Sequence, residues 1–197
     1  MPNLKLIIIS SCCFVLACVL WGFAIDRGGN ALCTGLEVEV LGDGDLHFVT
    51  QESISQYVSN HGHLITGDSI ASIDTREIEV ELMLIPYLQS AEVYKTIDRK
   101  VKVQVNQRKP VMRIVFKDGG SSYVDNQGQF LPLSKSFSYK CLPVTGLDTL
   151  IDRGVQTDVF SNPYLSDLWS MARYIKHDEF WSAQFIQLDH DPEYGIV

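Results

Sequence analysis

The chain has 197 residues, and its 24 Asp and Glu outnumber its 16 Lys and Arg, giving a formal net charge of −8 at pH 7. This length holds one or two small domains. An acidic chain repels nucleic acid and anionic lipid headgroups, so we exclude nucleic acid as a partner.

The N-terminal part contains a long apolar run. Residues 6–25 include no Asp, Glu, Lys or Arg, and a helix rising about 1.5 Å per residue over such a run spans a bilayer core of about 30 Å. We therefore expect a transmembrane helix, with residues 1–5 as a cytoplasmic tail and residues 26–32 as a linker on the opposite side of the membrane. A cleaved signal peptide and a lipoprotein signal ending at Cys12 are the alternatives, although an h-region is normally only about 7–15 residues long.

Strand and helix signals follow one another after the linker. Alternating apolar and polar residues predict a first strand that begins near Leu36. Thr50 and Asp74 are suitable helix N-caps and predict two helices, and Pro86 ends the second.

Two alternating stretches, residues 90–97 and 101–107, come next. Their short Asp98-Arg99 connection predicts a β-hairpin. In the second stretch, one face is predicted to be buried and the other exposed. The buried face carries Val101, Val103 and Val105, and the exposed face carries Lys102, Gln104 and Asn106.

Proline and glycine divide the following segment. Pro110 has no amide donor, so the chain is expected to leave the first hairpin there. A second hairpin is predicted around Asp118-Gly119-Gly120, and a third turn is predicted at Asn126-Gln127-Gly128.

Three stretches of this sequence resemble one protein family. "VNQRKPV" at 105–111 and "YVDNQGQFLP" at 123–132 are similar to the hinge and first β-domain strands of the FtsQ/DivIB family of bacterial cell-division proteins. "IDTREIEVELMLIPYLQSAEVYKTID" at 73–98 resembles the second helix and hairpin of the POTRA domain of that family. The residues that match the motif of the family, with expected structural roles, are Arg108, Pro110, Tyr123, Asp125 and Gly128.

The resemblance implies an α+β protein. A single N-terminal transmembrane helix would precede a POTRA-like β-α-α-β-β domain at 33–107 and a mainly β domain with one helix at 108–197. Residues 163–177 have apolar residues at helical spacing and predict that helix. Phe180, Trp181 and Phe185 follow, and we expect this aromatic cluster to be core. Because family members continue with further strands, we expect the β-domain to be incomplete at its C-terminus.

The resemblance also implies a function. The family would make this chain a non-enzymatic scaffold without cofactor or small-molecule substrate, single-pass in the inner membrane at the division septum, with partners of the FtsB and FtsL type. We expect binding by addition of a partner strand to an exposed strand edge. The residues we expect at that surface are Tyr94, Lys102, Gln104 and Asn106, for which ordinary solvated surface is the alternative. POTRA units also occur in envelope assembly and transport proteins, which is the alternative function.

Little in the sequence indicates metal binding or catalysis. His61 and His63 lie close together, but no further ligands have supporting spacing, so no metal site is predicted. No nucleophile elbow or paired acid and base stands out. Cys33 and Cys141 could form a disulfide in an oxidising compartment, and two free thiols are an equally ordinary outcome.

Overall fold

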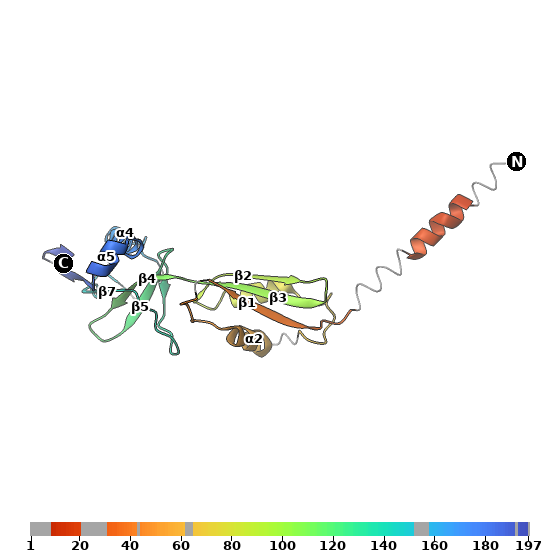
Figure 1. Ribbon diagram of the computed structural model, residues 1–197, viewed down its shortest axis with the longest axis horizontal. Coiled ribbons are helices and arrows are strands. Elements are labelled where there is room, and N and C mark those ends of the chain that lie inside the picture. Colours follow the sequence, from red (N-terminus) through yellow and green to blue (C-terminus); the bar gives the residue numbers. More distant parts are fainter. Residues whose placement is uncertain are drawn as a thin grey trace. The chain divides into compact units, whose positions relative to one another are not determined.

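The computed structural model (Figure 1) describes residues 9–20, 31–42, 44–61, 65–151, 158–191 and 193–196. The chain divides into two compact units. The first consists of residues 1–39, 51–82 and 92–104, and the second consists of residues 40–50, 83–91 and 105–197. The predicted domain boundaries at 33–107 and 108–197 stay predictions.

Residues 9–20 form a helix. In the part of the chain that the structure describes, no helix is both long enough and apolar enough to cross a membrane. The rest of the predicted span at 6–25, the predicted tail at 1–5 and residues 26–30 of the predicted linker lie outside the described residues.

A three-stranded sheet with two helices follows the expected β-α-α-β-β order. Its elements are β1 (Gly35–Leu41), α2 (Gln51–Asn60), α3 (Thr75–Leu82), β2 (Leu88–Lys95) and β3 (Lys100–Gln107). The strand order is β1-β3-β2, so β3 is the central strand. The predicted cap of α3 is present, because Asp74 Oδ1 accepts hydrogen bonds from the amides of Arg76 and Glu77 at 2.9 and 3.2 Å.

The predicted alternation of β3 is confirmed. Val101, Val103 and Val105 are each fully buried, while the residues between them are partly exposed. Each helix buries two apolar residues at helical spacing: Ile54 and Val58 in α2, and Ile78 and Leu82 in α3. The period of two in the strand and the period near four in the helices therefore determine the buried faces.

The second sheet has six strands in the order β6-β5-β4-β7-β8-β9. They are β4 (Pro110–Val115), β5 (Ser121–Asp125), β6 (Phe130–Leu131), β7 (Leu142–Thr145), β8 (Leu188–Asp191) and β9 (Gly195–Ile196). The β4–β5 hairpin matches the prediction and pairs Val115 with Ser121 across the turn. β7 runs parallel to both β4 and β8.

Two helices, α4 (Pro163–His177) and α5 (Glu179–Gln184), come between β7 and β8 (Figure 1). Pro163 occupies the first turn of α4, and the side chain of Asn162 caps that helix by accepting from the amide of Tyr164. The apolar stripe of α4 joins the main core of this unit through Leu165, Leu168, Trp169, Ala172 and Ile175.

The aromatic residues after α4 are not core. Phe180, Trp181 and Phe185 are 63%, 39% and 40% exposed, and α5 has no buried residue. The prediction of a buried cluster is wrong because α5 is short and the side chains of its two aromatic residues remain partly in solvent.

Candidate partner-binding surfaces

The exposed face of the first unit is a network of paired charges. Lys102 Nζ lies 2.8 Å from Glu39 Oε2 and 3.8 Å from Glu37 Oε1. Gln104 Nε2 donates to the same Glu39 oxygen at 2.7 Å. The hydrogen bond from Lys102 lowers the pKa of Glu39, and the same bond raises the pKa of Lys102. These polar side chains therefore already have partners within the chain.

The position of β3 corrects one part of the binding hypothesis. Lys102, Gln104 and Asn106 were expected on a strand with an exposed edge, but their strand β3 lies between β1 and β2. Its main-chain groups face these neighbours, so the sheet edges belong to β1 and β2. The expectation that Lys102, Gln104 and Tyr94 contact a partner stays a prediction.

A glutamate side chain of α3 forms a hydrogen bond with the edge of β2. The amide of Val93 donates to Glu79 Oε1 of α3 at 3.0 Å. Because this amide bonds α3 and not the neighbouring strand, it points away from β3, and the amide of Lys95, two residues further on, points the same way. Tyr94 is 40% exposed on this strand. Sequence reasoning missed Glu79, which looked like an ordinary exposed helix residue.

In the second unit, the side chain of Asn106 also has a partner. Asn106 Nδ2 donates to Ser90 Oγ at 2.9 Å. Neighbouring Gln107 is buried, accepts from the amide of Val49 at 3.1 Å and donates to the carbonyl of Leu46 at 2.9 Å. Gln107 thus holds the loop before α2, a role for which the sequence carries no local signal.

The motif residues form one structural network. Arg108 Nη1 lies 2.7 Å from Asp125 Oδ2, and the carboxylate of Asp125 is fully buried. Asp125 Oδ1 accepts from the amides of Gln127 and Gln129, both at 2.8 Å, and so shapes the turn. Pro110 begins β4. The aspartate therefore joins Arg108, two residues before β4, to the turn after β5.

Gly128 and Tyr123 occupy packed positions. Gly128 has a φ of +78°, and a Cβ there would lie 2.8 Å from Val159 Cγ2, so both backbone and space require glycine. Tyr123 is fully buried, and an aromatic cluster surrounds it. Its ring meets Phe48 edge-on at 5.8 Å, and Phe48 stacks on Tyr87 at 5.2 Å.

The two cysteines considered for a disulfide are both free. Cys33 is buried, and its Sγ donates to the carbonyl of Gly35 at 3.4 Å. Burial raises the pKa of Cys141 to about 12. Pairing of Cys33 with Cys141 in an oxidising compartment stays a prediction.

Metal ligands do not cluster in the described ranges, which contain no group of three His, Cys, Asp or Glu placed to hold an ion. His61 Nδ1 lies 2.8 Å from the carbonyl of Tyr57 at the end of α2. His63 lies outside the described residues.

A β-α-α-β-β unit followed by a unit built on a mixed sheet is the arrangement of a POTRA-like domain that precedes a mainly β domain. A model of the POTRA-like domain matches residues 31–106, and a model of the FtsQ/DivIB C-terminal related domain matches residues 109–197. The chain belongs to the FtsQ/DivIB family. These are non-catalytic scaffold domains and indicate a role in cell division. No curated protein matches the chain.

Proposed function

We propose that this chain is a divisome scaffold that links septal division proteins and contacts partners of the FtsB and FtsL type. The observation that carries the proposal is the consecutive match of residues 31–106 and 109–197 to the two domains of one family. A POTRA-containing assembly or transport module would account for the first match alone. The neighbouring genes discriminate between the two, because cell-wall and division genes favour the scaffold and an outer-membrane barrel gene favours the module.

The proposed mechanism in the first unit is strand addition to the edge of β2. A partner strand would use the outward amide of Lys95, while the side chain of Tyr94 would meet its side chains. Lys102 and Gln104 reach toward Glu39 of β1, so they are proposed to make a separate polar contact on the exposed face of the sheet. Main-chain hydrogen bonds would supply affinity, and these side chains would supply specificity. In the second unit, Asn106 is proposed to contribute a separate polar contact.

Removal of one outward amide tests the mechanism. Lys95→Pro removes a donor that does not point toward β3, so the hairpin is expected to fold as in the wild type. Binding of the full-length chain to the FtsB- and FtsL-type proteins of the same genome is then measured by co-purification. We expect loss of binding for Lys95→Pro and retention for Lys95→Ala. Equal binding of both variants would exclude this edge, and absence of binding by the wild type would exclude these partners.

We also propose that residues 6–25 anchor the chain in the inner membrane, with residues 26–197 in the periplasm at the septum. The uncharged run motivates this proposal. Protease added to intact spheroplasts should digest the outer part and leave an N-terminal anchor fragment. A mature protein whose first residue lies beyond residue 20 would show that the segment is removed.

A further inference from the structure

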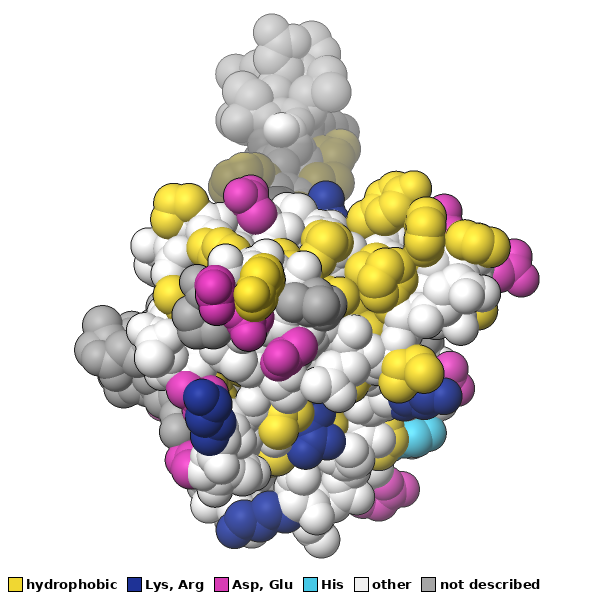
Figure 2. All heavy atoms as spheres, turned by 90° about the vertical axis from the view of Figure 1, so that its left-hand side faces the viewer, with side chains coloured by type: hydrophobic (Ala, Val, Ile, Leu, Met, Phe, Trp, Pro, Cys, Tyr) yellow, Lys and Arg dark blue, Asp and Glu magenta, His cyan; other side chains and the backbone are white. Residues whose placement is uncertain are grey.

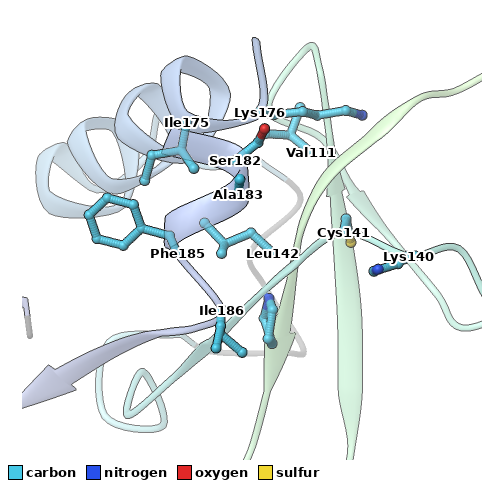
Figure 3. A pocket seen from close by; sticks show the side chains of 11 residues that line it. Val111, Lys140, Cys141, Leu142, Ile175, Lys176, Ser182, Ala183, Phe185 and Ile186 are labelled. Carbon is cyan, nitrogen blue, oxygen red and sulfur yellow. The ribbon is translucent and has the colours of Figure 1, made fainter. Parts of the chain in front are cut away.

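A pocket of about 540 Å³ opens in the second unit between its helices and its sheet. Figure 3 shows Ile175 of α4 and Phe185, just after α5, on the helical side, with Leu142 of β7 across from Phe185. Val111 of β4 and Cys141 line the opposite part. The volume lies within the range of about 300–1,000 Å³ that is usual for binding sites. Apolar side chains from four segments therefore converge on one hollow.

The cations of this pocket have no acidic neighbour in its lining. Lys140 and Lys176 line the pocket, and none of the described lining residues is Asp or Glu. A second hollow shares Lys140, Cys141 and Pro143 with the first and adds Arg113, again without a lining carboxylate. Nε of Arg113 is buried with no hydrogen-bond partner in the described structure. Lys140 thus lines both hollows, and neither hollow has a carboxylate among its described lining residues.

Lys176 and Arg113 interact with groups that line the pocket or lie beside it. Lys176 and Arg113 both favour the charged form of the Cys141 thiol, although burial outweighs them and raises its pKa. Lys176 Nζ donates to the carbonyl of Pro110 and lies 5.1 Å from the ring centroid of Tyr139. Lys140 is exposed, and no carboxylate pairs with it in the described part of the chain. Lys140 is therefore the cation best placed to meet a ligand.

The pocket continues into an exposed apolar patch formed by Phe180, Trp181, Phe185 and Ile186. Phe185 and Ile186 line the pocket and are still 40% and 85% exposed. The rings of Phe180 and Trp181 meet edge-on at 5.0 Å, and Trp181 and Phe185 are 5.7 Å apart. Figure 2 shows groups of exposed hydrophobic side chains on the surface that faces the viewer. The apolar surface extends beyond the hollow and suits an occupant longer than a small molecule.

We propose that this pocket and patch bind a polypeptide segment of a partner protein that carries a large apolar side chain next to an Asp or Glu. The apolar side chain fills the hollow beside Ile175 and Leu142, and the carboxylate pairs with Lys140. None of these residues lies on β2, so the site is independent of strand addition.

The same observations decide against two other occupants. A small-molecule site encloses most of its ligand, whereas Ile186 at this site stays 85% exposed. An anionic lipid offers an acyl chain and a negative headgroup, but a bilayer surface of that charge repels a chain with an excess of acidic residues. A single acidic and apolar peptide segment meets the local charge without that opposition.

A random dodecapeptide phage library tests the proposal when selected on the full-length chain in phosphatidylcholine nanodiscs, which carry no net charge. We expect enrichment of peptides in which Asp or Glu adjoins Phe, Trp, Leu or Ile. Their affinity is then measured as synthetic peptides by fluorescence anisotropy. No enrichment, or enrichment of peptides without acidic residues, would overturn the proposal.

Pairs of matched variants test whether Lys140 and Ile186 belong to the peptide-binding site. Lys140→Glu should weaken peptide binding about tenfold or more, as loss of a charge-assisted contact does, while Lys135→Glu makes the same charge change at another exposed lysine and should leave binding unchanged. Ile186→Ser should weaken binding, and Ile97→Ser is its control at another highly exposed isoleucine. Equal effects within either pair would overturn the site. Flotation with phosphatidylglycerol vesicles that depends on Lys140, without peptide binding, would assign the site to lipid and overturn the proposal as stated.

Discussion

At the scale of single residues, Asp125 is a buried charge whose stability depends on one paired residue. Its carboxylate is fully buried, and Arg108 provides the paired charge at 2.7 Å. Removing one member of a buried ion pair costs about 3–5 kcal/mol because the other charge stays unpaired. We therefore expect Arg108→Met to lower the free energy of unfolding, measured in urea, by that amount.

The double variant Arg108→Met with Asp125→Asn separates the ion pair from the turn. The introduced asparagine side chain would still have an oxygen to accept from the amides of Gln127 and Gln129, while no charge would remain buried. This variant should recover part of the lost stability. If it is no more stable than Arg108→Met alone, the pair does not determine the cost.

Two glycines with positive φ distinguish backbone strain from close packing. Gly119 and Gly146 have φ values of +85° and +81°, but a Cβ at Gly119 meets nothing within 4 Å, whereas a Cβ at Gly146 would overlap the carbonyl oxygen of His190 in β8. Both Gly→Ala changes incur strain of about 1–3 kcal/mol. We expect Gly146→Ala to cost clearly more in thermal unfolding, because β8 must move. Equal melting temperatures would contradict the close approach.

At the scale of elements, β3 tests whether alternation determines the fold. Val103 is fully buried, and Gln104 donates to Glu39 on the opposite face. Val103→Glu buries an unpaired carboxylate and should cost several kilocalories per mole, enough to unfold the sheet. Gln104→Glu places a second carboxylate beside Glu39 at a solvated face, so we expect a loss below about 1 kcal/mol. Circular dichroism during heating would show similar melting if the register of β3 were shifted by one residue.

At the scale of the whole molecule, the second unit includes residues 40–50 and 83–91 as well as its C-terminal sheet. Phe48 reaches Tyr123 at 5.8 Å and Phe137 at 5.0 Å. Truncating a buried Phe to Ala costs about 3–5 kcal/mol. Phe48→Ala should therefore lower the urea midpoint reported by tryptophan fluorescence, since Trp169 and Trp181 lie in this unit.

Phe180→Ala is the control for that experiment, because Phe180 is 63% exposed and should contribute little to stability. If Phe48→Ala leaves the fluorescence transition unchanged, the segment before α2 does not stabilise the second unit.

Local patterns predicted much of this architecture. The valine alternation of β3, the cap at Asp74 and the hairpin around Gly119 depend on neighbours in sequence, and each is present. Strand order depends on distant pairing, so the central place of β3 and the parallel pairing of β7 with β4 and β8 could not be derived locally. The exposure of Phe180 and Trp181 was missed because composition does not tell which apolar side chains find a covering element.

The hydrogen bond between Val93 and Glu79 affects how readily other extended chains pair with the edge of β2. An edge strand with all its amides open would recruit any extended chain, including copies of itself. Here a carboxylate from α3 already holds a central amide of β2, so an incoming strand must displace it and gains little at that point. Chance pairing of extended chains with the edge of β2 is thereby disfavoured.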